Sequence, residues 1–222
     1  MELDVEGEAT QVHVERVINL GYSGRDQDAV QDHIEELASE GIDPPDQIPT
    51  TYEVSPHISL VDPGNITVIG GETSGEAEFG LVITENDMFV LAASDHTDRN
   101  LESESVHLSK QVTPNVISRT AWRLETVREQ WDEISITAMN TREGEAELYQ
   151  KATLGEILPP EEIIDVCERR YSGSLTDTLI LSGTVPTVSS GVSPGERFEV
   201  VLEHPTDSRE LRVGYDIRTV DE

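Results

Sequence analysis

The chain has 222 residues and a formal net charge of −30, from 45 aspartates and glutamates against 15 lysines and arginines. A surface of this charge repels phosphate backbones and anionic headgroups, which argues against nucleic acid and membrane lipid as partners. The single cysteine, Cys167, excludes an internal disulfide and suits a reducing compartment, so we expect a cytoplasmic protein.

The acidic residues are spread along the whole chain instead of forming one block. This distribution is typical of the solvated surface of a halophilic protein, in which salt screens the self-repulsion. Only two of the basic residues are lysines, Lys110 and Lys151, and a lysine retained against such a bias is expected to have a specific role. We see neither a basic start followed by an apolar run nor about 18 consecutive apolar residues, so the sequence predicts no signal peptide and no membrane span.

The N-terminal part predicts an extended segment followed by a helix. Residues 3–20 contain "QVHVERVINL", which alternates as a strand does. The apolar residues of "GRDQDAVQDHIEELASEGI" then recur at helical spacing, and Gly41 is expected to end this helix. Three prolines in "DPPDQIP" cannot continue it, and residues 52–69 read as short strands broken by turns.

The middle of the chain predicts two hairpins and short helices. "FGLVI" and "TENDMFVLAAS" form the first hairpin, turning at residues 85–87, and Ser94 or Asp95 is expected to cap a short helix after it. A helix or turn at 121–134, a second hairpin at 135–153 and helices around a proline break at 154–171 follow. The last fifty residues hold three strand-like runs, "TDTLILSGTVP", "PGERFEVVLEH" and "ELRVGYDI".

No repeat and no low-complexity linker divides the sequence. We therefore predict one α+β domain, mainly β, over residues 1–222. Within it, residues 1–60 form an N-terminal strand and helix segment, and residues 61–222 form a β-rich core.

Two carboxylates stand at the start of the first hairpin, in "GETSGEAEFGLVI". Glu76 and Glu78 face the same way in a strand, roughly 7 Å apart, and a divalent cation between them would relieve their repulsion. Antiparallel pairing of the hairpin brings Asp95 next to them as a third oxygen ligand. The alternative is a pair of solvated surface glutamates, because the tetrapeptide Gly-Glu-Ala-Glu, which contains both residues, recurs at 144–147 in this acidic chain.

Together with later motifs, this segment resembles the fumarylacetoacetate hydrolase superfamily. "SGEAEFGLVI" followed by "SDHTDRNLE" is similar to its Glu-x-Glu strand and its N-D-x-S-A-R-D-x-Q segment. The resemblance implies Glu76, Glu78 and Asp95 as metal ligands and places Arg99 on the family's arginine. "HLSKQVTPNV" resembles the K-x-F-D-T-F-x-P stretch and puts Lys110 on the active-site lysine, which would supply positive charge to a carboxylate or oxyanion.

Two further motifs complete the resemblance. "GRDQDAVQDHIEE" is similar to the G-x-N-Y-x-x-H-x-x-E segment and implies His33 and Glu36 as an acid/base dyad on a lid helix. "LILSGTVP" followed by "GVSPGERFEVVLE" resembles the closing strands and implies Thr184, with Arg25 and Arg99, as substrate contacts. Several readings stay open. The His-x-x-Glu pair could be an exposed helix face, and Arg99 could instead pair with Asp95 or Asp98.

The resemblance implies a mixed β-sandwich roll with short helices, a Mg²⁺ or Mn²⁺ cofactor and a homodimer or higher homo-oligomer. It implies a hydrolase or lyase that acts on a small 2-keto or β-diketo acid through a metal-stabilised enolate. Keto-acid decarboxylation or isomerisation at the same site, and a non-catalytic metal-binding member of the fold, are the alternatives. His96 is not expected to be a ligand, because hard cations prefer oxygen. Departures such as "QVTPNV" after the lysine concern the substrate pocket more than the ligands.

Overall fold

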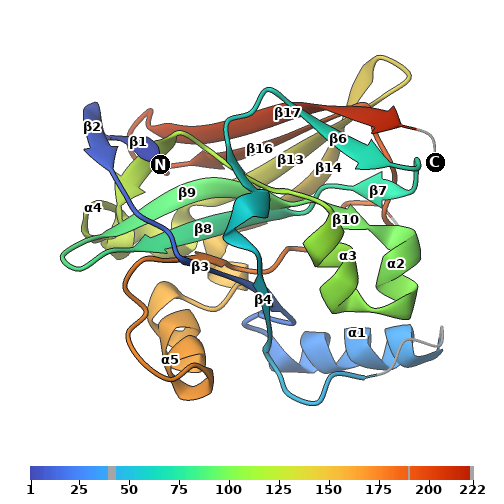
Figure 1. Ribbon diagram of the computed structural model, residues 1–222, viewed down its shortest axis with the longest axis horizontal. Helices are drawn as coiled ribbons and strands as arrows, with labels where there is room; N and C mark the ends of the chain where they lie inside the picture. Colours follow the sequence, from blue (N-terminus) through green and yellow to red (C-terminus); the bar gives the residue numbers. More distant parts are fainter. Residues whose placement is uncertain (40–43, 190, 221–222) are drawn as a thin grey trace.

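The computed structural model describes residues 1–39, 44–189 and 191–220, except the side chains of His33, Glu36, Leu37 and Ser39 (Figure 1). Strands dominate and form two main sheets. The larger sheet has, in spatial order, β2 (Glu8–Gln11), β1 (Glu2–Val5), β12 (Thr120–Arg123), β9 (Met88–Asp95), β8 (Ala77–Ile83), β15 (Thr178–Leu181), β3 (Arg16–Gly21) and β4 (Thr50–Val54). Off this path, β11 (Asn115–Ile117) pairs with β9 and with β5 (Ser59–Val61).

The smaller sheet lies across one face of the larger one (Figure 1). Its order is β14 (Glu145–Thr153), β13 (Ser135–Arg142), β16 (Arg197–Glu203), β17 (Glu210–Val220) and β6 (Asn65–Ile69). The short pair β7 (Thr73–Ser74) and β10 (Thr97–Asp98) extends the β8–β9 hairpin. The N-terminal segment, residues 1–60, and the β-rich core, residues 61–222, contribute strands to the same large sheet, since β3 pairs with β15.

The helices are short and lie around the sheets. They are α1 (Gln27–Ser39), α2 (Arg99–Glu104), α3 (Val106–Val112), α4 (Leu124–Val127) and α5 (Pro160–Arg170), with 3-10 turns at Pro56–Ile58, Arg128–Glu133 and Leu154–Glu156. In Figure 1, α1 and α5 lie on the side of the large sheet away from the small one, and α2 and α3 lie at one end. No helix in the described ranges has the length and apolar composition needed to cross a membrane.

Two hydrophobic cores result from the two faces of the central hairpin. Phe79 and Leu81 of β8 pack with residues of the small sheet such as Phe198 and Tyr215. On the opposite face, Val82 and Leu91 belong to a second core made entirely from strands of the large sheet and the segments that join them. The large sheet therefore curls over its own second face, and β8 and β9 are buried on both sides, which explains their continuous apolar sequence.

Most predicted elements are confirmed, including the helix from Gln27, both hairpins and the three C-terminal strands. The predicted helix stop at Gly41 lies outside the described residues. The first extended segment is wrong as a single element, because a turn with left-handed Glu6 and Gly7 divides β1 from β2 and β3 starts only at Arg16. The predicted caps are also wrong. Ser94 and Asp95 still belong to β9, and α2 and α3 are capped by Asp98 and Ser105.

Candidate metal centre

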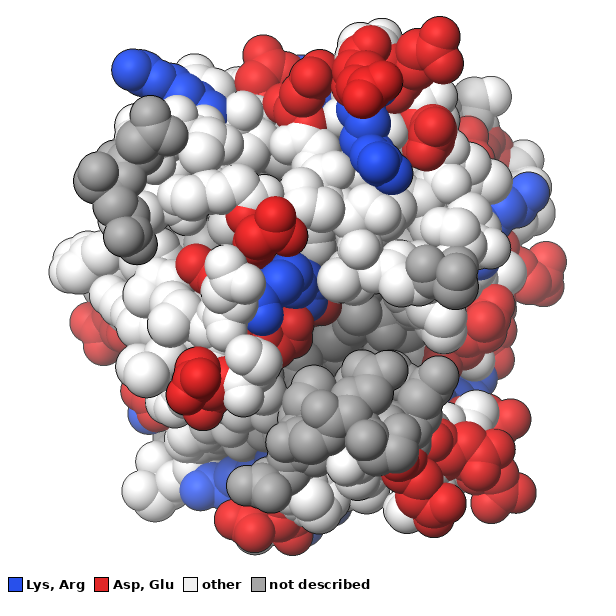
Figure 2. Space-filling model, turned by 90° about the vertical axis from the view of Figure 1, so that its right-hand side faces the viewer, with Lys and Arg blue, Asp and Glu red and all other residues white. Residues whose placement is uncertain are grey.

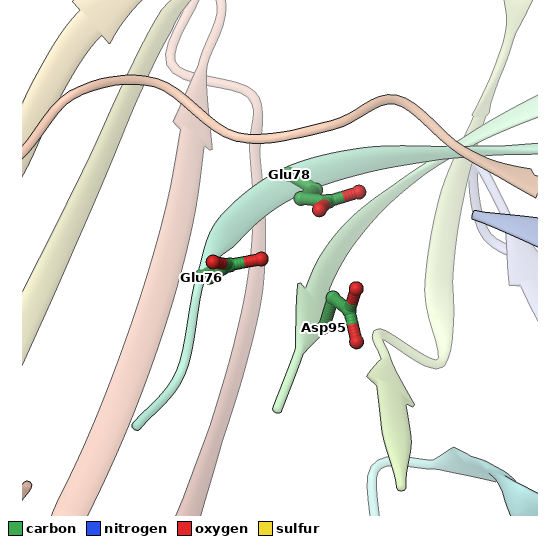
Figure 3. Close-up of side chains that lie close together, drawn as sticks. All are labelled: Glu76, Glu78 and Asp95. Carbon is green, nitrogen blue, oxygen red and sulfur yellow. The ribbon is translucent and has the colours of Figure 1, made fainter. Parts of the chain in front are cut away.

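Glu76, Glu78 and Asp95 meet at one end of the second core. Glu78 lies opposite Ala93 in the hairpin, and the Asp95 amide donates to the Glu76 carbonyl at 3.3 Å. Because strand side chains alternate, all three carboxylates fall on the face that carries the second core. Figure 3 shows the three side chains directed to the same side of β8 and β9. One oxygen of each lies within 4.8 Å of the others, so the predicted grouping is present in the structure.

Burial separates this cluster from the rest of the acidic residues. Glu78 and Asp95 have no exposed surface, and no other aspartate or glutamate whose side chain the structure describes is buried. Glu76 is partly covered, with 14% of its side chain exposed. Buried carboxylates are costly unless paired or bound to a metal, so their position requires a compensating partner.

Lys110 of α3 supplies part of that compensation and is itself buried. Its ammonium donates hydrogen bonds to Asp95 Oδ2 and, at 3.3 Å, to Glu76 Oε2. Helix α3 is held in place by Thr113, whose hydroxyl donates to the His96 and Ser109 carbonyls. Burial would lower the pKa of Lys110, but Asp95 and Glu76 raise it above its usual range, so the amine stays charged.

Arg99, at the start of α2, fixes the outermost carboxylate. Its Nη1 donates to Glu76 Oε1 at 3.0 Å and to Glu102 Oε2 at 2.8 Å, and its Nε donates to Ser74 Oγ at 2.8 Å. Arg99 therefore forms structural ion pairs, as the open alternative expected, but with Glu76 and Glu102 in place of Asp95 or Asp98. Burial would raise the pKa of Glu76, but Lys110 and Arg99 lower it to about 2, so this carboxylate is ionised.

Glu78 is held from the opposite side by the segment that follows β15. The Gly183 amide donates to Glu78 Oε2 at 2.9 Å, and Gly183 has a left-handed φ of 82° that favours glycine. A Cβ there would overlap Ser23 Oγ and lie 3.2 Å from the Leu20 carbonyl. Burial, with the negative charge of Asp95, raises the pKa of Glu78 well above its usual range.

The donor set fits a hard divalent cation. Glu78 Oε1 and Asp95 Oδ1 are buried and have no hydrogen-bond partner within the described part of the chain. Both belong to the three-carboxylate cluster, and carboxylate oxygens are the ligands that Mg²⁺ and Mn²⁺ prefer. Among the described residues, and counting Glu102, four carboxylates face the charges of Lys110 and Arg99 alone, so a divalent cation would balance the cluster once Glu78 has lost its proton.

The other predicted site residues do not share one position relative to the carboxylate cluster. Thr184 is exposed, and its hydroxyl donates to the Ala77 carbonyl at 3.0 Å. The residue therefore lies next to the β8–β9 hairpin. Arg25 does not contact the cluster, because its guanidinium forms two 2.8 Å hydrogen bonds with Asp132. His33 and Glu36 lie on α1, but their side chains are outside the described part of the structure.

Several supporting residues were missed by the sequence analysis. Gln150 of β14 accepts from the Ala77 amide and donates to Thr184 Oγ1, so it connects the small sheet to β8. Asn19 and Asn115 are fully buried and hydrogen bond to each other, and Asn115 lies opposite Asp95 in the β11–β9 pair. Their only local signal is a polar residue within an apolar strand.

His96 points away from the carboxylates, as its place in the alternation requires. Its Nδ1 lies 3.1 Å from the Tyr215 hydroxyl and its Nε2 lies 2.9 Å from Thr73 Oγ1, so both ring nitrogens are engaged. Burial lowers the pKa of His96 to about 3, which keeps the ring neutral. The prediction that His96 is not a ligand agrees with these contacts.

The face of the molecule next to α1, α2 and α3 is shown in Figure 2. Basic and acidic side chains lie together near its centre, and further acidic side chains lie toward the rim.

The fold defines the class of protein. The chain superposes on a candidate fumarylacetoacetate isomerase/hydrolase from Oleispira antarctica with a TM-score of 0.70 and 15% identity, over 98% of this chain and 99% of that chain. A yeast fumarylacetoacetate hydrolase family protein gives a TM-score of 0.65 at 16% identity, over 93% and 94%. A 2-keto-3-deoxy-D-arabinonate dehydratase, crystallised with magnesium and 2,5-dioxopentanoate, gives 0.67 at 16% identity, over 95% and 75%.

These similarities confirm the predicted fumarylacetoacetate hydrolase-like α+β fold. At such identities they establish the fold and leave the reaction open. Within this class, the chain belongs to the family described as a protein of unknown function (DUF2848), whose model matches residues 20–215. A comparison with curated proteins gives no match.

Proposed function

We propose that the chain is a metal-dependent hydrolase or lyase that acts on a small 2-keto or β-diketo acid. The observation that carries this proposal is the pair of buried carboxylates, Glu78 and Asp95, each with an unpartnered oxygen, beside the buried ammonium of Lys110. A purely structural ion cluster would be expected to satisfy its buried oxygens internally. Two oxygens left open in one cluster favour a bound cation.

Glu76, Glu78 and Asp95 are the proposed ligands of Mg²⁺ or Mn²⁺. A cation bound there supplies Lewis-acid stabilisation for the negative charge that develops on the oxygens of a keto acid when a bond to the neighbouring carbon breaks. Arg99 fixes the orientation of Glu76, and the Gly183 amide fixes that of Glu78.

Lys110 is the proposed substrate-binding cation. An ammonium group has three donors, and the two carboxylates use two of them. The third can bind a carboxylate or oxyanion of the substrate. Thr184 is proposed as a further substrate contact, because it is exposed and its hydroxyl donates to the carbonyl of Ala77 in β8, the strand that carries Glu78.

His33 and Glu36 are proposed as the proton-transfer pair. The two residues are three positions apart on α1, so they share one face of the helix, which is the spacing at which a glutamate can orient an imidazole. Figure 1 shows α1 on the same side of the molecule as α2 and α3, which carry Arg99 and Lys110. The magnesium and 2,5-dioxopentanoate of the dehydratase crystal support the same substrate class for a chain with this fold.

The chain offers a matched control for testing this proposal, because Gly-Glu-Ala-Glu occurs at 75–78 and again at 144–147. The test is calorimetric titration of Mg²⁺ and Mn²⁺ into chelator-treated protein in molar salt, with oxalate added as an enolate mimic. We compare wild type with Glu76→Gln/Glu78→Gln and with Glu145→Gln/Glu147→Gln, whose glutamates are exposed on β14.

Saturable binding that oxalate tightens, and that only the first double variant loses, is the expected result. Absence of specific binding in wild type, or equal loss in both variants, would remove the metal and with it the proposed chemistry. Metal binding without turnover of any keto acid would favour the non-catalytic alternative.

A further inference from the structure

A pair of buried asparagines closes the second core at the end that carries the carboxylates. Asn19 of β3 and Asn115 of β11 have no exposed surface, although both lie in mainly apolar strands. Val17 and Ile117, two residues away in the same strands, belong to the second core. Because strand side chains alternate, both asparagines point into that core.

The two asparagine side chains bind each other reciprocally. The Asn19 amide nitrogen donates to Asn115 Oδ1 at 3.0 Å, and the Asn115 amide nitrogen donates to Asn19 Oδ1 at 2.9 Å. The pair connects β3 to β11, two strands that are not neighbours in the large sheet. The backbone of Asn115 is held as well, since β11 pairs with β9 on one side and with β5 on the other.

Asn115 is the direct neighbour of Asp95, because the two residues lie opposite each other in the β11–β9 pair. Three positions further along this pair, the Ser118 amide donates to the Ala92 carbonyl. Since antiparallel pairs alternate, Asn115 and Asp95 form a non-hydrogen-bonded pair, whose side chains share one face with Cβ atoms about 4.5–5.5 Å apart. Glu76 lies on the other side of Asp95, because the Asp95 amide donates to its carbonyl.

A stable core does not require a polar pair at this place. Each amide has two donors and an oxygen that can accept twice, and the reciprocal bonds use one of each. Two apolar residues of similar shape would fill the same space at little or no cost. Asn140, the third buried asparagine in the described part of the chain, has a plain structural role, since it donates to the Ser193 carbonyl at 3.1 Å and so holds a loop.

We propose that the Asn19–Asn115 pair fixes the position of Asp95 and thereby makes the metal centre selective for Mg²⁺ over the larger Ca²⁺. The inference rests on the proposed function, since it assumes that Glu76, Glu78 and Asp95 bind a cation. Mg²⁺ requires nearly ideal octahedral geometry at about 2.0–2.1 Å, whereas Ca²⁺ accepts irregular geometry at about 2.3–2.6 Å. Ligands that cannot move apart therefore favour the smaller ion.

The contacts of Asp95 are consistent with this positioning role. Lys110 binds Asp95 Oδ2, but it comes from the short helix α3 and not from the sheet. Asp95 Oδ1 has no hydrogen-bond partner among the residues that the structure describes. Asn115, fixed through its strand and through Asn19, limits the rotation of the Asp95 carboxylate and so keeps Oδ1 directed into the cluster.

The experiment compares wild type with Asn19→Leu/Asn115→Leu, which removes both amides and leaves neither one unpaired. Asn19→Ser is the second variant, because it breaks the reciprocal pair and keeps Asn115 beside Asp95. Asn140→Leu is the matched control, a buried strand asparagine of the small sheet. Urea unfolding establishes that each variant is folded. Calorimetry on chelator-treated protein in molar salt then measures the dissociation constants of Mg²⁺ and Ca²⁺.

We expect wild type to bind Mg²⁺ more tightly than Ca²⁺. The ratio of the Ca²⁺ to the Mg²⁺ dissociation constant should fall about 10-fold in the double variant, the lower end of the usual effect of residues that orient metal ligands. It should also fall in Asn19→Ser and stay unchanged in Asn140→Leu.

Three results would overturn the inference alone and leave the metal centre in place. They are a wild type that binds Ca²⁺ as tightly as Mg²⁺, an unchanged ratio in the variants of the pair, and an equal fall in Asn140→Leu. If the double variant does not fold, Asn19→Ser decides by the same criterion. If wild type binds neither cation, the proposed function fails and the inference falls with it.

Discussion

Replacing Lys110 with methionine tests whether its ammonium compensates the buried carboxylates. The change removes a hydrogen bond to Asp95, which has no exposed surface, whereas Glu76 keeps Arg99 at 3.0 Å. Methionine is flexible and fills a volume close to that of the lysine stem, so lost packing contributes little. The penalty in metal-free protein is therefore mainly that of an uncompensated buried carboxylate.

The size of the penalty is limited by the easiest response of Asp95, which is protonation. Protonating a carboxyl group with an ordinary pKa of about 3.9 costs about 4 kcal/mol at pH 7 and about 1.5 kcal/mol at pH 5. Removal of one partner from a buried ion pair typically costs about 3–5 kcal/mol. We expect Lys110→Met to lower the free energy of unfolding by about 3–4 kcal/mol at pH 7 and by about 1.5 kcal/mol at pH 5.

The assay is urea unfolding in molar salt with chelator, followed by the fluorescence of the two buried tryptophans, Trp122 and Trp131. Lys151→Met is the control, because Lys151 is the other lysine and is exposed, so its loss should change stability by less than about 0.5 kcal/mol. Saturating Mg²⁺ should reduce the Lys110→Met penalty by supplying the missing positive charge. A penalty that is independent of both pH and Mg²⁺ would refute the electrostatic reasoning and indicate a packing defect.

Three further predictions concern the metal ligands, the glycine behind them and the surface. Because burial raises the pKa of Glu78, the folded metal-free protein retains a proton there, and its stability falls as the pH rises from about 4.5 through that raised pKa. Glu78→Gln should therefore be more stable than wild type at pH 8 in chelator and should gain nothing from Mg²⁺, and the reverse order in thermal unfolding would contradict this. Gly183→Ala should cost about 2 kcal/mol more than Gly191→Ala in urea unfolding, because both have a positive φ but only Gly183 is crowded. The thermal midpoint of wild type should rise steeply between 0.1 M and 1 M salt, where the Debye length falls from about 10 Å to about 3 Å, and a flat response would refute the halophilic interpretation.

The repeated Gly-Glu-Ala-Glu shows what local sequence could predict about the site. Residues 75–78 lead into β8, which lies between β9 and β15, whereas residues 144–147 begin β14 at the edge of the small sheet. The same four residues are therefore covered in one place and exposed in the other. The distinguishing signal in the sequence is the apolar run "FGLVI" after the first copy, since a strand buried on both faces must continue as apolar residues.

Strand periodicity was sufficient to predict that the carboxylates lie together, but not to predict where the basic side chains of Lys110 and Arg99 lie. Asp95 meets Glu76 because side chains alternate and antiparallel strands align the start of one with the end of the other. Lys110 and Arg99 come from helices whose docking depends on tertiary contacts, such as the hydrogen bond from the Ser55 amide to Gln111. No local pattern encodes such docking. This explains why the sequence left the partners of Arg99 open.

Arg25 illustrates the same limit over a longer distance. Its motif predicted a substrate contact, yet its guanidinium pairs with Asp132, 107 residues further along the chain. In a chain with three times as many acidic as basic residues, almost any arginine can find a carboxylate, so a motif position alone cannot say which one.

Acidic composition changes which observation is informative about a metal site. Counting carboxylates in the sequence has little value here, because 45 acidic residues generate Glu-x-Glu pairs by chance. The burial of a carboxylate is a much stronger indication of a metal site, for the same reason. A surface that carries so many charges gives no cause to bury one, yet Glu78 and Asp95 are fully buried beside Lys110, one of only two lysines. Each buried charge lowers the stability of the fold unless it is compensated, so the cluster is best explained by a ligand that the fold is built to hold.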